Sequence, residues 1–346
     1  MKYAYHHPKS NQLKSIAILM MLCLHLFNRD YKELFQPLVF IGNQPLSYYI
    51  SLFSDACVPI FAFVSGYGLY FKFRQKKQSY YSDNLTRLKK LYLNYWIIIL
   101  LFPVILGLVL GFDGYPGSWQ KLLLNLTAID LSYNGAWWFL TTYIIFVLTS
   151  RFWFGLLETL HPIVFLVALL IIYLIAFYFR IYNSAIFENR VFDWVHRQLA
   201  LYFCTLFQFM LGAFALKFEW QEKVTFLFRS VKFKNFVVLL AIVCLIAVHG
   251  IVPNFIIAPF TGLAFIFLFL QLDLSQFINK VIDFFTPHST NIWLVHMFFY
   301  MIYFPDFIYS VKYVPLIFGL LVLVSVLSSY LIKFFEKPLS SLLFSR

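Results

Sequence analysis

Charged residues are scarce in this sequence. Asp, Glu, Lys and Arg make up 12% of its 346 residues, whereas soluble domains carry roughly 25%. Hydrophobic residues make up 62%, and the mean hydropathy is +0.78. The composition is not that of a soluble globular domain and indicates a polytopic membrane protein.

Cysteine is rare, and the common motifs of soluble enzymes are missing. The four cysteines, Cys23, Cys57, Cys204 and Cys244, all fall in apolar segments without paired spacing, so we expect no disulfide framework and no thiolate metal site. The sequence contains no nucleophile elbow, no P-loop and no metal-ligand cluster, and its intramembrane histidines are too scattered to suggest zinc. We therefore expect no bound metal and no bound cofactor.

The net charge of +12 does not point to nucleic acid. The cations lie in short loops between apolar runs, where they are better explained as topology signals. We expect membrane lipids, rather than nucleic acid, to surround this protein.

Ten apolar runs approach or reach the roughly 20 residues that a membrane-spanning helix needs. They cover residues 13–27, 46–71, 88–111, 137–154, 163–179, 199–217, 236–250, 255–272, 290–309 and 314–335. The alternative for the seventh and eighth runs is one re-entrant element broken by Pro253 and Pro259. The sequence thus predicts an all-α bundle of about ten transmembrane helices, forming a single domain over residues 1–346.

The distribution of Lys and Arg predicts the orientation. The loops at residues 72–90 and 217–234 are strongly basic, which places them and the Lys-bearing N-terminus in the cytoplasm. The loop at residues 28–45 balances Arg29 and Lys32 against Asp30 and Glu33, as suits the outer side. An even number of spans then puts both termini in the cytoplasm, and we expect the plasma membrane as the location.

His25 lies within the first apolar run, eleven residues after Lys14. An ionisable side chain within a membrane helix costs roughly 2.5 kcal/mol or more to insert, so it suggests a functional site. Eleven residues make about three helical turns, which places both side chains on one face, about 16 Å apart. A cation at the entrance and an imidazole deeper in the wall suit an anionic ligand. Alternatively, Lys14 extends to the lipid headgroups and His25 bonds a neighbouring helix.

Several motifs occur in the order typical of one family. The Lys-x10-His spacing is followed by Val58, Pro59, Ile60, Phe61, Ala62, Phe63, Val64, Ser65, Gly66 and Tyr67. Further motifs are Arg87-Leu88-Lys89-Lys90, Tyr95-Trp96, Trp138-Phe139-Leu140, Trp293-Leu294-Val295-His296 and Glu336-Lys337-Pro338. Together they resemble the acyltransferase family 3 membrane proteins, which pair an Arg-x10-His first helix with a VPxFFxxSGY-like second helix. The resemblance covers nearly the whole chain.

This resemblance implies transfer of an acyl group, usually acetyl, from cytoplasmic acyl-CoA to a hydroxyl of a glycan or lipid-linked sugar. By this resemblance, His25 would be the catalytic base. Burial favours the neutral imidazole, which can accept a hydroxyl proton. The CoA phosphates would meet four cations at the cytoplasmic face, namely Lys14, Arg87, Lys89 and Lys90. Lys14 replaces the family's arginine, so it keeps the charge and loses the bidentate fork. The last three cations also suit an ordinary positive-inside loop.

Other residues are candidates for the substrate pocket. His296 would polarise the thioester or bind acceptor hydroxyls, or else form an ordinary interhelical hydrogen bond. Asp55 would orient His25 as a carboxylate partner of the base. The full set expected in the pocket is Asp55, Ser65, Gly66, Tyr67, Trp138 and His296.

We therefore expect an integral membrane O-acyltransferase that uses acetyl-CoA as the donor. Its acceptor would be an extracytoplasmic polysaccharide or its lipid-linked precursor, and polysaccharide assembly proteins are possible partners. Direct transfer and an acyl-enzyme route both stay open. The main alternative is an exporter or flippase for a glycan or lipid-linked oligosaccharide, although we find no internal symmetry of the kind that transporters show. A third interpretation is a non-catalytic membrane subunit of such an assembly complex.

Overall fold

The computed structural model describes residues 8–344, which are almost entirely helical. The few residues before and after this range, where the cytoplasmic termini are expected, lie outside the described part. Within it, the strands are β1 (Phe40–Ile41) and β2 (Gln44–Pro45), which pair antiparallel as one short hairpin. The predicted all-α class is confirmed.

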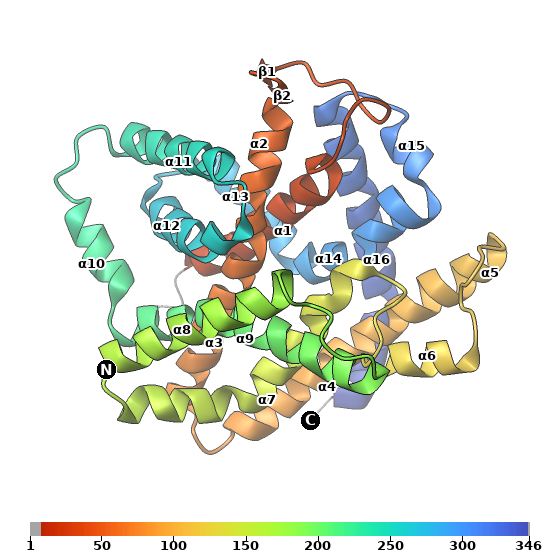
Figure 1. Cartoon of the computed structure of the whole chain (residues 1–346), viewed down its shortest axis with the longest axis horizontal. Coiled ribbons are helices and arrows are strands. Elements are labelled where there is room, and N and C mark those ends of the chain that lie inside the picture. The colour runs from red at the N-terminus through yellow and green to blue at the C-terminus, as the bar shows by residue number, and fades with distance from the viewer. Residues whose placement is uncertain (1–7, 345–346) are drawn as a thin grey trace. The chain divides into compact units, whose positions relative to one another are not determined.

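Eight segments of the described chain are long and apolar enough to cross a membrane. They are formed by α1 (Pro8–Phe27), α2 (Leu46–Phe53) with η1 (Ser54–Ala56) and α3 (Cys57–Gln75), α4 (Tyr80–Ile99) with η2 (Leu100–Leu106) and α5 (Gly107–Val109), η3 (Gly135–Trp137) with α7 (Trp138–Thr159), α8 (Pro162–Ile181), α9 (Arg190–Lys217), α11 (Lys234–Ile251) and α16 (Val314–Phe344). The α-helices among them are labelled in Figure 1. Each segment corresponds to one of the ten predicted runs. The protein is therefore a multi-pass membrane protein.

The other two predicted runs form shorter helices. Residues 255–272 give η4 (Phe255–Ile257) and α12 (Ala258–Gln271), and residues 290–309 give α14 (Ser289–Met297), the π-helix η6 (Phe298–Tyr303) and α15 (Pro305–Tyr309). The ninth run is not one continuous helix, because Phe304 leaves the helical conformation and Pro305 begins a new helix. At the seventh and eighth runs, α11 and α12 are separate helices that pack against each other, with Pro253 in the loop between them.

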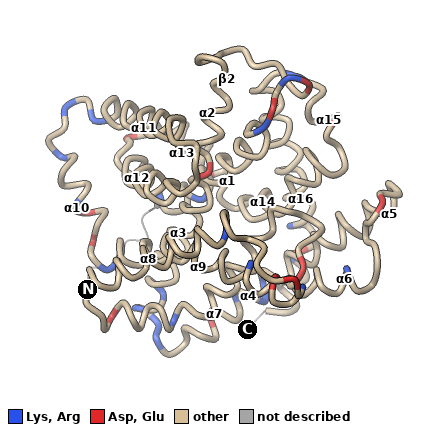
Figure 2. Tube along the Cα trace, in the orientation of Figure 1, with Lys and Arg blue, Asp and Glu red and all other residues tan. Residues whose placement is uncertain are grey.

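The two basic segments contain more helix than predicted. α3 continues to Gln75 and α4 begins at Tyr80, so Arg87, Lys89 and Lys90 lie on a helix rather than in a loop. The segment at residues 217–234 contains α10 (Trp220–Leu227), and Figure 2 marks several Lys and Arg positions in blue along this part of the trace. The cause is local, since α4 has the helix-forming Leu, Arg and Lys side chains in its basic turn. The remaining short helices are α6 (Trp119–Leu126), α13 (Gln276–Phe285) and η5 (Thr286–His288).

The chain separates into two compact units, each built from segments far apart in sequence. Counting described residues, the first unit contains the chain up to Met20 together with Leu52–Tyr80 and Thr142–Asp283. The second unit contains Met21–Ser51, Tyr81–Thr141 and the chain from Phe284 onward. A single functional domain over residues 1–346 stays a prediction.

The first unit is organised around α3 and α9, which lie side by side (Figure 1). Their backbones approach so closely that a Cβ atom on Gly66 would lie 1.7 Å from the carbonyl oxygen of Phe209, and one on Gly212 would lie 2.0 Å from that of Phe63. Small residues of this kind allow membrane helices to pack closely. Gly66 therefore marks a helix contact, as small residues in membrane helices commonly do.

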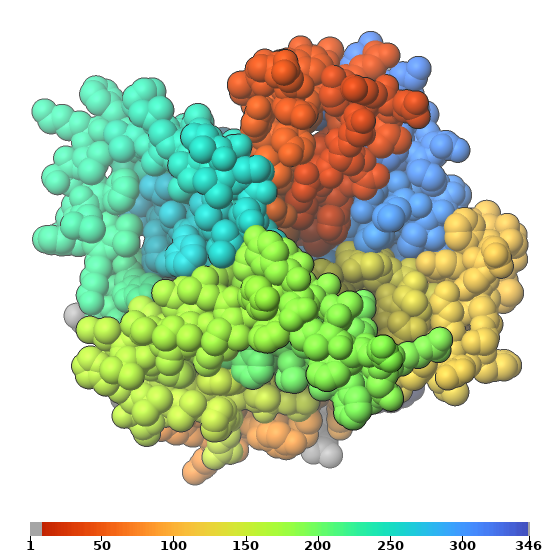
Figure 3. All heavy atoms as spheres, in the orientation of Figure 1, coloured from red at the N-terminus to blue at the C-terminus, as the bar shows by residue number. Residues whose placement is uncertain are grey.

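Helix α8 packs on α9 and contributes to the face of the molecule seen in Figure 3. Its exposed side chains are apolar. Ile163, Val164 and Ile175 are each more than half exposed on it. An exposed face without charges suits lipid rather than water, which agrees with a membrane-spanning helix.

The second unit contains a buried polar network. Asn94 of α4 donates to Asn291 of α14 at 2.7 Å, and Asn291 donates to Ser329 of α16 at 3.1 Å. His288 bonds the same hydroxyl at 2.9 Å. These side chains are almost fully buried, so their hydrogen bonds join three helices where apolar packing alone would not fix the register.

Candidate functional site

A pair of histidines lies within the second unit. Nδ1 of His25, near the end of α1, is 2.7 Å from Nε2 of His296 on α14. The two ring planes are within 9° of parallel, and their centroids are 5.0 Å apart. His296 is fully buried, whereas His25 retains partial exposure. Residues 271 positions apart in sequence thus form one imidazole pair.

The second nitrogen of His296 faces the backbone of its own helix. Nδ1 lies 2.8 Å from the carbonyl oxygen of Trp293 and 3.2 Å from that of Ile292. Both ring nitrogens of His296 are therefore engaged, one with the helix and one with His25. Contacts on both sides hold this ring in one orientation.

Arg29 and Tyr300 complete the surroundings of the pair. The Tyr300 ring lies nearly parallel to both imidazoles, at 6.2 Å from His25 and 5.8 Å from His296 between centroids. Nη2 of Arg29 donates to the backbone carbonyl of His25 at 2.7 Å, and its guanidinium carbon lies 5.2 Å from the centre of the Tyr300 ring. This cation–π contact brings a positive charge beside the histidines.

Neither Arg29 nor Tyr300 was recognised from the sequence. Arg29 was interpreted as one charge of a balanced outer loop, and Tyr300 was hidden among many aromatic residues. A usable signal was present, because Arg29 follows His25 by four positions and Tyr300 follows His296 by four. Residues four apart lie on one face of a helix.

The backbone of α14 changes its hydrogen bonding next to His296. The N–H of Phe298 bonds to the carbonyls of Val295 and His296 instead of the usual α-helical acceptor, Leu294. The Leu294 carbonyl accepts instead from Nδ2 of Asn134 at 3.1 Å and from Nε1 of Trp137 at 2.8 Å. Side chains of another segment thus bond a backbone carbonyl of α14 next to the start of the π-helix η6.

Two further contacts tie the same segment to α14. Nε1 of Trp293 donates to the Ala136 carbonyl at 2.9 Å, and the Ala136 N–H lies 3.0 Å from the sulfur of Met297. The predicted pocket residue Trp138 directly follows Trp137 and is the first residue of α7. Trp137, rather than Trp138, makes the bond to the Leu294 carbonyl.

The two π-helices of the second unit face each other. The rings of Phe102 in η2 and Phe298 in η6 are 5.0 Å apart and nearly parallel, and the hydroxyl of Tyr303 donates to the Phe102 carbonyl at 3.0 Å. π-Helices are rare and often occur at functional sites, because the extra residue in the turn redirects side chains. Here η6 carries Tyr300.

The predicted site residues are divided between the two units. Lys14, Asp55, Ser65, Gly66 and Tyr67 belong to the first unit, and His25, Arg87, Lys89, Lys90, Trp138 and His296 belong to the second. Lys14 and His25 lie on the same unbroken helix, α1. Within the second unit, the structure pairs His296 with His25. The functional roles of the whole set stay predictions.

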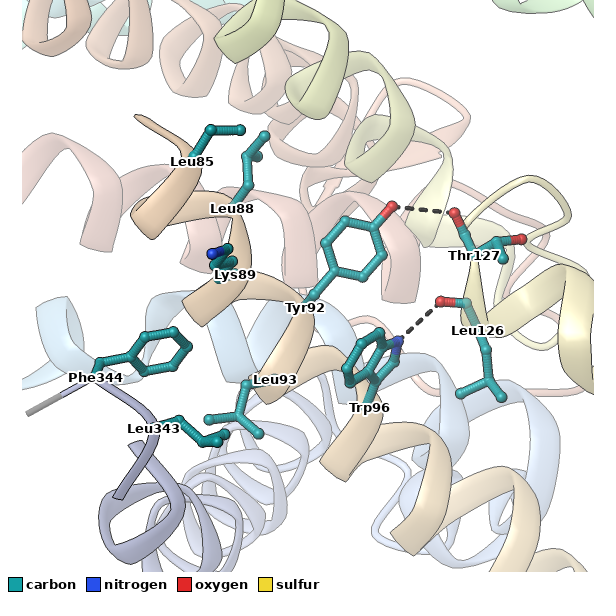
Figure 4. Close-up of a pocket in the computed structure, with 10 residues that line it drawn as sticks. All are labelled: Leu85, Leu88, Lys89, Tyr92, Leu93, Trp96, Leu126, Thr127, Leu343 and Phe344. Carbon is teal, nitrogen blue, oxygen red and sulfur yellow. Dashed lines mark hydrogen bonds between the residues drawn. The ribbon is translucent and has the colours of Figure 1, made fainter. Parts of the chain in front are cut away.

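Tyr67 and one of the α4 cations, Lys89, line two hollows, one in each unit. Tyr67, Ser10 and Leu13 border a cavity of about 20 Å³ in the first unit, which has room for about one water molecule. In the second unit, Lys89 borders a groove of about 640 Å³ (Figure 4). The ammonium group of Lys90 lies 5.7 Å from the centre of the Phe344 ring.

The lining of the larger groove is mainly apolar. Its two aromatic polar groups are already bonded, Tyr92 to the Thr127 carbonyl at 3.0 Å and Trp96 to the Leu126 carbonyl at 2.9 Å, as Figure 4 shows. Lys89 is the charged residue among the groove's lining residues. Within residues 8–344, no three His, Cys, Asp or Glu side chains come close enough to hold a metal ion.

A comparison with protein families gives a match to the acyltransferase domain of acyltransferase family 3 over residues 8–334. The chain belongs to acyltransferase family 3. The match includes α1 with its Lys14 and His25, and it extends through α14 into α16. No curated protein and no solved structure matches the chain.

Membership in this family makes the protein a membrane acyltransferase. The histidine pair of this acyltransferase is suited to proton transfer, because an imidazole held by a hydrogen bond at one nitrogen can accept a proton at the other. A hydroxyl acceptor needs such a base when it attacks an acyl carbon.

Proposed function

We propose that this acyltransferase transfers an acetyl group from cytoplasmic acetyl-CoA to a hydroxyl of an extracytoplasmic polysaccharide or lipid-linked glycan. We place it in the plasma membrane with both termini in the cytoplasm. The observation that carries the proposal is the pairing of His25 with His296 in a chain of this family. An imidazole pair can accept and release protons, and acyl transfer to a hydroxyl requires that the hydroxyl proton be removed.

In the proposed reaction, His25 accepts the proton of the acceptor hydroxyl. The acceptor oxygen attacks the thioester carbonyl carbon, a C–O bond forms, and the C–S bond breaks. The protonated imidazole then returns its proton to the CoA sulfur. The products are the O-acetyl ester and CoA, so the base is regenerated in each turnover.

For the donor, we propose contacts between the CoA phosphates and Lys14, Arg87, Lys89 and Lys90. A lysine acts on phosphate as a point charge, so the change from arginine to Lys14 keeps the attraction and removes the fork. Asp55, Ser65, Gly66, Tyr67 and Trp138 remain proposed contacts of the substrates. Polysaccharide assembly proteins remain proposed partners.

The test is an assay of the purified full chain in detergent, with isotope-labelled acetyl-CoA and a panel of glycan and lipid-linked sugar acceptors. Release of CoA should match the amount of acetylated acceptor. His25→Ala should lower kcat by roughly 10²- to 10⁴-fold, the usual contribution of a general base. The control is His249→Ala, which removes another buried imidazole whose Nδ1 lies 3.3 Å from the Thr261 hydroxyl.

We expect His249→Ala to keep kcat within a few-fold of the wild type, because its hydrogen bond is to Thr261 in the first unit, whereas the histidine pair belongs to the second. Equal losses in the two variants at equal folded yield would contradict a catalytic role for His25. Absence of acetyl transfer to every acceptor class would contradict the proposed substrates.

The orientation can be tested separately by cysteine labelling in a cysteine-free background. Gln78 lies in the turn between α3 and α4, and Ser118 precedes α6 and caps it by accepting from the N–H of Lys121. A membrane-impermeant reagent should label a cysteine at 118 from outside and one at 78 only after the cytoplasmic side is opened. Labelling of both from the same side would overturn the proposed topology.

A further inference from the structure

The contacts of His296 determine which of its nitrogens carries hydrogen. A carbonyl oxygen can only accept, so Nδ1 of His296 must donate to the Trp293 carbonyl at 2.8 Å. A neutral imidazole carries one N–H, which leaves Nε2 of His296 as an acceptor. This nitrogen is the one that faces His25.

The same reasoning extends to His25. Two bare lone pairs do not approach to 2.7 Å, so Nδ1 of His25 must carry the hydrogen that it donates to Nε2 of His296. The centroid separation of 5.0 Å nearly equals this distance plus the two ring radii, so both nitrogens lie on the line between the centroids. The N–H bond therefore points along the ring plane, as a good hydrogen bond requires.

The opposite direction of donation is disfavoured by burial and charge. For His296 to donate through Nε2 while also donating through Nδ1, it would have to be a cation. Its side chain is fully buried, and Arg29 already places a positive charge beside the pair. An unpaired buried cation is expensive, so the neutral arrangement holds.

We propose that His296 is the positioning residue of the catalytic base, in a chain running from the Trp293 carbonyl through His296 to His25. By accepting from Nδ1, His296 holds His25 in the tautomer whose lone pair is on Nε2, and Nε2 is the nitrogen that takes the acceptor's proton. This assignment rests on the proposed function, with His25 as the base.

A histidine suits this position better than a carboxylate inside a membrane. Carboxylate partners of catalytic histidines are common in soluble enzymes, but a carboxylate within the bilayer costs free energy unless it is paired. A neutral imidazole accepts the same hydrogen bond without adding a charge. When His25 takes up the proton, its bond to His296 becomes charge-assisted and therefore stronger.

Two substitutions at position 296 separate positioning from packing. His296→Gln can place its side-chain oxygen near the position of Nε2 and so retains an acceptor, whereas His296→Leu keeps an apolar side chain of comparable volume without an acceptor. We expect His296→Leu to lower kcat by about 10²-fold or more with little change in the donor KM, since a wrong tautomer at a catalytic histidine can cost about 10⁴-fold. His296→Gln should recover most of this loss.

Nitrogen NMR of the full chain labelled with ¹⁵N-histidine gives a readout that does not depend on activity. The signals of His25 are identified by their disappearance in His25→Ala. In the wild type, Nδ1 of His25 should be protonated and Nε2 bare. In His296→Leu, the two tautomers should both be populated.

The outcomes distinguish this inference from the proposed function. If wild-type protein transfers no acetyl group, the proposed function fails, while the NMR spectrum still tests the tautomer. If wild-type protein is active and His25→Ala is not, equal kcat values for His296→Gln and His296→Leu overturn the positioning role. A wild-type spectrum with Nε2 of His25 protonated also overturns it, even if both variants fail to fold.

Discussion

The contact between α3 and α9 in the first unit differs in kind from the surroundings of α14 in the second. At the first, Gly66 and Gly212 bring backbones together with no side chain between them. At the second, the Leu294 carbonyl and the His296 ring are held by side-chain hydrogen bonds. Family motifs thus have at least two physical uses in one chain. One type allows helices to approach closely, and the other holds polar groups in defined directions.

The most severe test of this contrast is Gly66→Ala. A Cβ atom there would lie 1.7 Å from the Phe209 carbonyl oxygen, and backbone cannot move aside as a flexible side chain can. We expect a loss larger than the roughly 1–3 kcal/mol typical of overpacked cores, seen as a low yield of folded protein. Fluorescence-detected size-exclusion chromatography would measure it.

Gly68→Ala is the matched control. Gly68 lies on the same helix as Gly66, but a Cβ atom there would meet nothing within 4 Å. It should be neutral or stabilising by up to about 1 kcal/mol, since alanine favours the helix more than glycine does. Equal yields for the two variants would show that the close approach of α3 and α9 is not needed.

The contrast would be weakened if the first unit also binds the acyl donor. Substitutions of Lys14, which belongs to that unit, test this. If its ammonium binds a CoA phosphate, Lys14→Ala should remove about 1.5–3 kcal/mol of binding, seen as a donor KM at least roughly tenfold higher. Lys14→Arg should keep the donor KM or lower it, since arginine retains the charge and adds the fork. Initial rates against acetyl-CoA concentration decide the matter. An unchanged donor KM in Lys14→Ala would limit Lys14 to anchoring the helix.

Asn134 tests the polar side of the contrast. Its side chain donates to the Leu294 carbonyl and accepts from the Ala136 N–H at 2.9 Å. Asn134→Ala should destabilise the protein by about 1–3 kcal/mol because buried polar groups lose their partner. Thermal unfolding in detergent would show this as a lower apparent Tm.

Asn134→Ser separates the two bonds, since serine can still cap the following turn but is too short to reach Leu294. We expect an intermediate apparent Tm. A value equal to that of the wild type would mean that the bond from Trp137 satisfies the Leu294 carbonyl by itself.

The smallest expected effect is at Tyr303, which joins the two π-helices. Tyr303→Phe removes the hydrogen bond to the Phe102 carbonyl and keeps the ring contacts, so we expect a loss of about 0.5–1.5 kcal/mol. kcat should stay within about twofold, because the hydroxyl does not touch the histidine pair. The control, Tyr182→Phe, changes an exposed ring, and its apparent Tm should equal that of the wild type. A large loss of kcat in Tyr303→Phe would show that the π-helices control the site directly.

Much of the candidate site could be proposed from sequence, but its geometry could not. His25 and His296 were both recognisable as imidazoles within apolar runs. Their pairing was not, because contacts between residues 271 positions apart depend on how helices pack. Arg29 was placed in a charge-balanced loop, although it lies four positions after His25. The expected continuous ninth helix is in fact interrupted at Phe304, before Pro305 begins a new helix. Hydropathy averages over a window and therefore does not detect such a break.

By itself, the sequence determined the properties that depend on neighbouring residues: the apolar length of the membrane-spanning helices, the basic segments between them and the order of the family motifs. These follow from transfer free energies that each segment carries wherever it packs. Only the tertiary structure decided that Gly66 lies against a backbone, that Trp137 rather than Trp138 holds the Leu294 carbonyl, and that His296 accepts from His25. Those outcomes depend on which atoms of different segments meet and at what angle, and this is fixed only when the helices pack together.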